Sequence, residues 1–418
     1  MVEHWDFLLV NGESNYIKVK SPKYDGIELQ DFDLVEPLKF SNEKEEEIKP
    51  SVQQIQNEKR RIYIEFFKKP FKNLLVLTGA GSSIGSGGKS MYELWDIAER
   101  NYFFEEEDGK LINSDFQTLC LEIKFDYATK NLEALLSKIE GCIRFSEDKE
   151  IQFKKGKQKL SEIRKQIFET IRIECTIKTS PENTPHKKFL EKVLQRKQTS
   201  PRIKVFTLNY DTLFENAAQS SNAIIIDGFS YTMPRTFSGR YFDYDIVQRE
   251  GSKLKEEDNF IQRVFHLHKL HGSINWETDV ITGKVVINSE TKDPLMVYPR
   301  DAKYEDSYEQ PFFEMMARFQ RSLRQNNDTL LICIGYSFND KHINSAIEEA
   351  LNQNPGFRLA VIDPGINNAN SRMIELKNHA LNSNRILMIA ETFSDFAHNY
   401  PEIQTYDENQ IDIVNLSK

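Results

Sequence analysis

The stretch that decides the fold is Leu74-Leu-Val-Leu77, which runs directly into Thr78-Gly-Ala-Gly-Ser-Ser83. The first four residues form an apolar run of strand length, and the two glycines after it are typical of a tight turn. Ser90 and Glu93 then have the S-x-x-E spacing of a capping box, in which each side chain bonds the other residue's backbone N–H at a helix start. The order strand, glycine turn, helix predicts an α/β unit.

Two more units of this kind follow along the chain. Ile203-Lys-Val-Phe-Thr-Leu-Asn209 predicts a strand, and Asp211 can cap the helix after it. Asp328-Thr-Leu-Leu-Ile-Cys-Ile-Gly335 predicts a buried strand, Asn339 caps the next helix, and Arg358-Leu-Ala-Val-Ile-Asp363 predicts another strand. A strand-helix-strand crossover requires parallel strands. The sequence therefore predicts an α/β fold with a Rossmann-like parallel sheet flanked by helices.

The organisation around these units is less regular. Residues 1–70 contain short apolar runs and a charged stretch, which favours an N-terminal appendage, and residues 401–418 are expected to form a C-terminal tail. The main domain is expected over residues 71–400. Residues 219–262 are rich in glycine, aromatic and charged residues, as is typical of an irregular connection, and could cover a site.

A helical insertion is expected over residues 100–200. The apolar residues Leu132, Leu135, Leu136 and Ile139 recur there at helical spacing. The lysine-rich stretch over residues 153–159 is interpreted as the solvated face of a helix rather than as a surface for a phosphate backbone.

Composition excludes several classes of protein. The chain has 418 residues, with 55 Lys and Arg against 64 Asp and Glu and a net charge of −9, which argues against a protein that coats nucleic acid. Its apolar runs are far shorter than the roughly 20 residues of a membrane helix. The first residues lack the pattern of a secretion signal. We expect a cytoplasmic protein that contacts no membrane and meets nucleic acid only indirectly, if at all.

Neither cysteines nor histidines indicate a metal site. The four cysteines contain no C-x-x-C pair; they are Cys120, Cys142, Cys175 and Cys333. His266 and His268 would share one face of a strand and could in principle bind a metal ion, but no third ligand is near them in the sequence. We therefore expect no zinc and a structural role for these two histidines.

Polar or glycine-rich residues follow several of the apolar runs. These places are Gly79–Ser83, Thr207–Asp211, Leu270–Ser273, Gly335–Asn339 and Asp363. In open parallel sheets a ligand sits beyond the carboxyl ends of the strands. Glycines at the first of these places allow the main chain to come close to a pyrophosphate, and backbone N–H groups add partial positive charge. Each place also has a simpler reading as a turn or a helix cap, so no single one decides the function.

Taken in order, these motifs resemble those of the sirtuin family. The match consists of a G-A-G-x-S loop, a T-x-N-x-D segment, an H-G dipeptide and a later G-x-S loop, and it covers roughly residues 70–395. The resemblance implies that Asn209 and His271 act on the nicotinamide ribose of NAD. It implies cofactor contacts by further residues of the same motifs: Gly79, Ala80, Gly81 and Ser83 at the pyrophosphate, Thr207 and Asp211 beside Asn209, Gly335 and Ser337 along the cofactor, and Asp363 at the adenosine ribose.

The chain also departs from the deacylating sirtuins. It lacks the two cysteine pairs of their zinc ribbon, and its glycine loop continues as Gly87-Gly-Lys-Ser-Met-Tyr-Glu-Leu-Trp95. With Thr207-Leu-Asn-Tyr-Asp211 and Lys269-Leu-His-Gly-Ser-Ile-Asn-Trp276, this form resembles the sirtuin-like NADases of prokaryotic anti-phage defence. The length resembles that of the sirtuin-like partner of a HerA-type ATPase.

That resemblance implies an NAD+ glycohydrolase, with NAD as the substrate and nicotinamide and ADP-ribose as products. Asn209 would orient the ribose and the attacking water, and His271 would act as the general base. The resemblance further implies an abortive-infection effector that forms a homo-oligomer and docks on a hexameric HerA-type ATPase. The alternatives are an ADP-ribosyltransferase and a dinucleotide-binding sensor or scaffold without turnover.

Overall fold

The computed structural model describes most of the chain. The described residues are 4–26, 28–41, 47–107, 110–113, 115–145, 148–153, 156–197, 200–248, 260–296, 310–325, 328–368 and 370–402. Of the expected C-terminal tail, only Pro401 and Glu402 lie among them, and Lys154 and Lys155 of the lysine-rich stretch lie outside.

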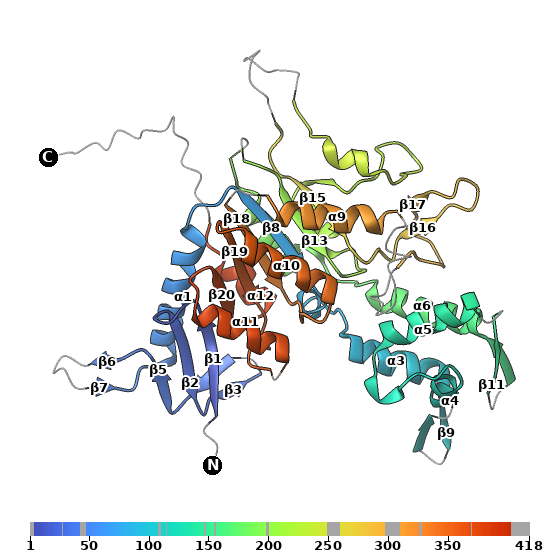
Figure 1. Ribbon diagram of the computed structural model, residues 1–418, viewed down its shortest axis with the longest axis horizontal. Coiled ribbons are helices and arrows are strands. Elements are labelled where there is room, and N and C mark those ends of the chain that lie inside the picture. The colour runs from blue at the N-terminus through green and yellow to red at the C-terminus, as the bar shows by residue number, and fades with distance from the viewer. Residues whose placement is uncertain are drawn as a thin grey trace.

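A ten-stranded sheet forms the centre of the molecule (Figure 1). Its order is β14 (Ile224–Ile226), β15 (Val264–Lys269), β13 (Ile203–Thr207), β8 (Asn73–Thr78), β18 (Thr329–Ile334), β19 (Phe357–Ile362), β20 (Ile386–Ile389), β1 (Trp5–Val10), β2 (Tyr16–Lys20) and β5 (Leu34–Glu36). The first seven strands are parallel, and the last three are antiparallel to their neighbours. The predicted α/β fold with a mostly parallel sheet is confirmed.

The carboxyl ends of the six inner parallel strands lie level with one another. The register places six terminal residues in a row across the sheet: Lys269, Thr207, Thr78, Ile334, Ile362 and Ile389. The chain proceeds from β8 to β13 on one side and later to β18 on the other, so β8 and β18 flank a switch point in the topology. Ligands of such sheets bind at this point, beyond the carboxyl ends.

Helices cover both faces of the sheet. One face packs against α1 (Val52–Lys68), α7 (Pro185–Val193), α8 (Leu213–Ser220) and α12 (Phe393–Asn399). The other face packs against α9 (Phe312–Leu323), α10 (Lys341–Gln353) and α11 (Ser371–Leu381). Residues along β8 alternate between these two cores, since Leu74 and Val76 belong to the first and Leu75 and Leu77 to the second. Burial on both faces explains the uninterrupted apolar runs of the sequence.

The glycine loop leads through α2 (Gly81–Ile84) to α3 (Met91–Phe103). The capping box predicted at the start of α3 is confirmed, because Ser90 N–H donates to Glu93 Oε2 at 2.8 Å and Glu93 N–H donates to Ser90 Oγ at 3.3 Å.

The segment expected as a helical insertion has a core of its own around Trp95. It contains α3, α4 (Asp115–Glu122), η1 (Tyr127–Thr129), α5 (Leu132–Phe145), α6 (Leu160–Cys175) and η2 (Pro181–Asn183), and in Figure 1 these helices gather beside the sheet. It also contains two hairpins, β9 (Phe104–Glu107) with β10 (Lys110–Asn113) and β11 (Glu150–Phe153) with β12 (Gly156–Lys159). The helix expected over residues 153–159 is therefore wrong. The glycine at 156 has a φ of +130°, which suits a hairpin turn and not a helix.

Residues 1–70 share the sheet and the core of the main domain. Leu9 and Val10 of β1 pair with Ile389 and Met388 of β20, and the blue β1 lies beside the red β20 in Figure 1. Helix α1 buries apolar side chains in the same core as β8. The expected N-terminal appendage is therefore not separate from the main domain, because it shares the sheet and the core. The expected domain boundaries stay predictions.

Short two-stranded sheets complete the structure. They are β3 (Lys23–Asp25) with β4 (Glu28–Asp31), β6 (Phe40–Ser41) with β7 (Glu47–Ile48), and β16 (Trp276–Thr278) with β17 (Val285–Ile287); η3 (Gly239–Asp243) lies in the connection between β14 and β15. Across the part of the chain that the structure describes, every helix is too short or too polar to span a bilayer.

Replacing a core residue of the first strands tests whether this segment is integral. Ile17 on β2 is fully buried in the core that contains α1. Ile17→Ala should lower the free energy of unfolding of the whole domain by about 2–5 kcal/mol, because a buried cavity replaces the lost side chain. Chemical denaturation followed by tryptophan fluorescence measures this. Val280→Ala, at a site 98% exposed, is the control and should leave stability unchanged. A loss below about 1 kcal/mol for Ile17→Ala contradicts the integral role.

Candidate active site

A cavity of about 1620 Å³ lies over the carboxyl ends of the inner strands. Its wall includes loops that follow β8, β13, β15, β18, β19 and β20, together with residues of α3 and α5. The volume exceeds the roughly 300–1,000 Å³ of pockets that hold one small molecule. Most of the predicted site residues line it: Gly79, Ala80, Gly81, Ser83, Asn209, Asp211, His271, Gly335, Ser337 and Asp363.

Three glycines bring the loops after β8 and β18 into backbone contact. A Cβ on Gly79 would lie 2.7 Å from the carbonyl oxygen of Gly335, and one on Gly81 would lie 2.7 Å from its Cα. Gly335 has a φ of +58°, and a Cβ there would overlap the backbone of Gly81 and Ser82. A hydrogen bond of 2.9 Å from Gly81 N–H to Gly335 O joins the two loops. The glycines are therefore required by this contact at the floor of the cavity.

Four N–H groups of the glycine loop already have acceptors. Those of Gly79 and Gly81 donate to Ile334 O and Gly335 O, and those of Ser82 and Ser83 donate to carbonyls within the loop. A phosphate that met these four groups would share donors that are already engaged.

Asn209 is fixed against this loop by its amide nitrogen. Its Nδ2 donates to Gly79 O at 2.9 Å, to Ser82 Oγ at 3.1 Å and to Ser83 Oγ at 2.8 Å. Among the described residues, no partner accompanies its Oδ1, which leaves a carbonyl oxygen as the acceptor that a ligand could meet. The amide thus has a defined orientation at the edge of the cavity.

Thr207 and Asp211 stabilise the backbone of Asn209 and the glycine loop. Thr207 is buried, its Oγ1 accepts from Asn209 N–H at 3.1 Å, and it is not part of the cavity wall. Asp211 Oδ2 accepts from Ser83 Oγ at 2.6 Å, and its Oδ1 accepts from Leu213 N–H at the start of α8. Asp211 therefore combines the predicted contact to the helix start with a buried link to the glycine loop.

His271 lies in the loop after β15, on the opposite side of β8 from the loops after β19 and β20. The next residue, Gly272, has a φ of +91°, and a Cβ on it would overlap the carbonyl oxygen of Leu295. The need for a residue without a side chain at position 272 explains the glycine of the H-G dipeptide. The Nε2 of His271 lies 3.4 Å from Asp340 Oδ2, and both side chains are almost buried.

Neighbouring groups favour the ionised form of the Asp340 carboxyl. Burial favours its protonated form, but the hydrogen bond and charge of His271 and the N–H groups of Ile343 and His342 outweigh burial, so its pKa lies below the ordinary value. It is also the N-cap of α10. The cap predicted at Asn339 is therefore one residue too early.

Glu133, from the first turn of α5, is a second carboxyl group in the cavity wall. Its Oε1 accepts from Tyr210 Oη at 3.3 Å. Burial raises its pKa, while His271 and the Tyr210 hydroxyl oppose that rise. The imidazole of His271 therefore interacts with one ionised carboxylate, Asp340, and with one carboxyl group whose proton is held more tightly.

Neither Asp340 nor Glu133 was predicted from the sequence. Asp340 follows the G-x-S loop and starts a helix. That position could have indicated a site residue, but a capping role alone accounts for it. Glu133 is an ordinary charge on an amphipathic helix, and only the packing of the insertion brings it near His271.

At the other end of the cavity, Asp363 follows β19 and Ser337 lies in the loop after β18. The Oδ1 of Asp363 accepts from Gly365 N–H at 2.7 Å, and burial raises the pKa of this carboxyl. Ser337 is exposed at the rim, and its carbonyl accepts from Asn370 Nδ2. The structure thus places both residues in the cavity wall, on the other side of β8 from His271.

His266 and His268 are packed among aromatic rings. The ring of His268 stacks on Phe242 with centroids 4.2 Å apart and on Phe206 at 4.5 Å. Burial lowers the pKa of His266 to about 4 and that of His268 well below its ordinary range. Within the described ranges, no group of three or more His, Cys, Asp or Glu side chains is arranged to hold a metal ion.

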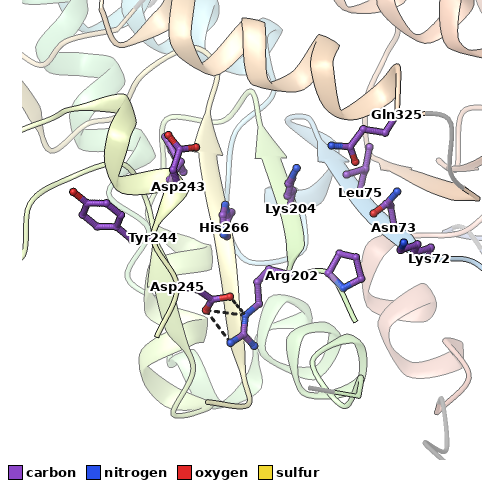
Figure 2. A pocket seen from close by; sticks show the side chains of 12 residues that line it. Lys72, Asn73, Leu75, Arg202, Lys204, Asp243, Tyr244, Asp245, His266 and Gln325 are labelled. Carbon is purple, nitrogen blue, oxygen red and sulfur yellow. Dashed lines mark hydrogen bonds and ion pairs between the residues drawn. The ribbon is translucent and has the colours of Figure 1, made fainter. Parts of the chain in front are cut away.

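A second cavity, of about 610 Å³, lies at the amino ends of the strands (Figure 2). His266 lines it, as does Arg202, whose guanidinium bonds Asp245. Residues 242–245 of the connection that could cover a site also line this smaller cavity, and none of the described residues in 219–262 lines the large one. These described residues therefore form no part of the wall of the large cavity.

A pair of glycine substitutions tests the contact at the cavity floor. Gly335→Ala should destabilise the protein by about 2–6 kcal/mol, because strain at positive φ and overlap with Gly81 add together. Gly141→Ala on α5 is the matched control, since a Cβ there meets nothing within 4 Å. It should stabilise the helix by about 0.5–1 kcal/mol. Thermal and chemical denaturation measure both, and a neutral Gly335→Ala contradicts the assigned contact.

Part of this chain is similar to a known protein family. Residues 203–383 match the model of the SIR2-like domain, which is less than half of the chain and contains Asn209, His271 and Gly335 but not the glycine loop. No curated protein matches the sequence. A SIR2-like domain indicates sirtuin-type chemistry that involves NAD, so the resemblance drawn from the motifs is confirmed at that level.

Two solved structures show a weak likeness. One is the structure of Sir2Tm bound to a propionylated peptide, with 11% identity over 81% of this chain and 96% of that one and a TM-score of 0.36. The other concerns the structural basis of sirtuin substrate affinity, with 12% identity over 80% and 95% of the chains and a TM-score of 0.34.

Proposed function

We propose that the protein is an NAD+ glycohydrolase that cleaves NAD+ to nicotinamide and ADP-ribose. The observation that carries the proposal is that Asn209 and His271, from loops after different strands, line one cavity together with the glycine loop. A site that only binds a dinucleotide needs neither an oriented amide nor an imidazole beside a carboxylate.

The reaction breaks the bond between C1′ of the ribose and nicotinamide, whose ring nitrogen takes the bonding electrons. An oxocarbenium-like transition state forms, and water attacks C1′ from the other face. Asn209, held by its Nδ2, uses Oδ1 to orient the ribose or the water. His271 accepts the proton of the attacking water, and Asp340 stabilises the resulting imidazolium.

His271→Ala tests the assignment of the base. The change should lower kcat by about 10²- to 10⁴-fold, the usual contribution of a general base, while ADP-ribose binding and the melting temperature change little. NAD+ consumption and nicotinamide release measure turnover. His379→Ala, at an exposed position on α11, is the control and should retain full activity. Asp340→Asn keeps an N-cap residue but removes the charge that faces His271, so it should lose activity with little loss of stability.

The outcomes separate the alternatives. Normal turnover by His271→Ala overturns the role of the imidazole. With labelled NAD+, label on macromolecules supports ADP-ribosyl transfer, whereas free ADP-ribose supports hydrolysis. Binding of NAD+ without any consumption, by the protein alone and with its partner, supports a sensor or scaffold.

We also propose, from the family resemblance, that the protein is a cytoplasmic anti-phage effector that forms a homo-oligomer on a HerA-type ATPase. The helical insertion is the better candidate for the contacts. Its Leu121 and Phe145 are 77% and 87% exposed, whereas β1, β2 and α1 bury most of their apolar side chains in the core of the main domain.

Light scattering tests the assembly. We expect the chain alone to be larger than a monomer and to form a defined complex with a co-encoded HerA-type ATPase. Leu121→Glu combined with Phe145→Glu should weaken that complex by at least about tenfold, because charges at a packed interface oppose its formation. A monomer in both conditions contradicts the proposal.

A further inference from the structure

A buried ion pair joins the N-terminal helix α1 to the wall of the large cavity. Lys59 Nζ lies 2.8 Å from Glu391 Oε1 and donates to Ala390 O at 3.3 Å. Both residues are buried, with exposures of 5% and 9%. Lys59 lies on a helix face that is otherwise apolar, beside residues such as Ile55, Ile62 and Tyr63.

Stability alone gives a weak reason for such a pair. Removing two charges from water costs several kcal/mol, and well-packed apolar residues in their place are often as stable or more so. A buried pair of this kind therefore calls for another explanation, and its position in the cavity wall supplies one.

The second carboxylate oxygen of Glu391 has no partner. Glu391 lines the cavity, and its Oε2 is buried without a hydrogen bond in the described residues. An unsatisfied buried acceptor is costly, and in native proteins a ligand or an ordered water usually meets such a group. Glu391 thus combines a place in the cavity wall with an acceptor that has no partner among the described residues.

The location of Glu391 fits one end of a dinucleotide. It follows β20, and the register pairs Ile362 with Ile389, so Glu391 and Asp363 follow neighbouring strand ends. From β13, which precedes Asn209, to β20 there are four strand spacings, or about 19 Å at roughly 4.8 Å each. That span suits an extended dinucleotide with its nicotinamide ribose at Asn209 and its adenosine at Asp363 and Glu391.

We propose that Glu391 recognises the adenosine end of the dinucleotide: Oε2 accepts a hydrogen bond from a neutral donor, while Lys59 holds the carboxylate from the other side. The inference rests on the proposed use of NAD+ by this cavity. The donor is a ribose hydroxyl or the adenine amine. A 2′-phosphate would bring negative charge beside two carboxyl groups, so the site selects against phosphorylated dinucleotides. Helix α1 thereby becomes part of the binding site.

Calorimetry with ADP-ribose tests the proposal, because binding of this product needs no turnover. The variant is Glu391→Gln combined with Lys59→Met in the full chain, which removes both charges and keeps the volume. We expect about tenfold weaker ADP-ribose binding, the scale of one weakened charged hydrogen bond. The preference for ADP-ribose over its 2′-phosphorylated form should fall by a similar factor.

The matched control removes a surface ion pair away from the cavity. Arg324, which follows α9, and Glu349 on α10 form an ion pair of 2.9 Å. Arg324→Met combined with Glu349→Gln removes this pair and should leave the affinities for ADP-ribose and its 2′-phosphorylated form unchanged. If the cavity-wall variant fails to fold, Glu391→Gln alone takes its place. The preference of the wild type for ADP-ribose over 2′-phospho-ADP-ribose, which we expect to be at least tenfold, is then measured as well. The inosine analogue of ADP-ribose identifies the donor, since weaker binding indicates the amine and equal binding a ribose hydroxyl.

Unchanged affinity and unchanged selectivity in the folded double variant overturn the inference, as does a wild type that does not bind ADP-ribose. Failure of the proposed function is a separate result: the wild type would bind ADP-ribose but leave NAD+ intact. If NAD+ is cleaved while the double variant binds like the wild type, only the role of Glu391 is wrong.

Discussion

The backbone contact between the loops after β8 and β18 is the constraint on which the site depends. Gly79, Gly81 and Gly335 lie so close that no side chain fits between them. This closeness gives the glycine loop a fixed shape, and the amide of Asn209 can then bond Gly79 O and Ser83 Oγ at the same time. The orientation of the amide is thus set by a contact between two strand ends that are far apart in the sequence.

Each wall of the cavity comes from a different part of the chain. The parallel sheet supplies the glycine loop, Asn209 and His271, the helical insertion supplies Glu133, and the N-terminal helix supports Glu391 through Lys59. His271 and Glu391 follow strands at the two sides of β8, which separates the proposed chemistry from the proposed recognition of adenosine. Residues 1–70 and the insertion can therefore affect the site without containing any of the sirtuin-like motifs.

The sequence was sufficient for features that depend on local pattern. Apolar runs predicted β8, β13, β18 and β19, the Ser90 and Glu93 pair predicted a helix start, and the position of polar residues after strands placed most candidate site residues on one cavity. Features that depend on distant partners were missed. The pairing of β1 with β20 has no local signature, the turn at Gly156 was read as helix, and nothing near Glu133 or Lys59 in the sequence indicates a cavity.

The central claim is that Asn209 and His271 meet the sugar of one bound nucleotide. A crystal structure of the protein with ADP-ribose measures this directly. The account predicts the terminal ribose between Asn209 Oδ1 and the His271 ring, the pyrophosphate over the glycine loop, and the adenosine beside Asp363 and Glu391. A nucleotide bound in the smaller cavity, or a terminal ribose that touches neither Asn209 nor His271, would contradict it.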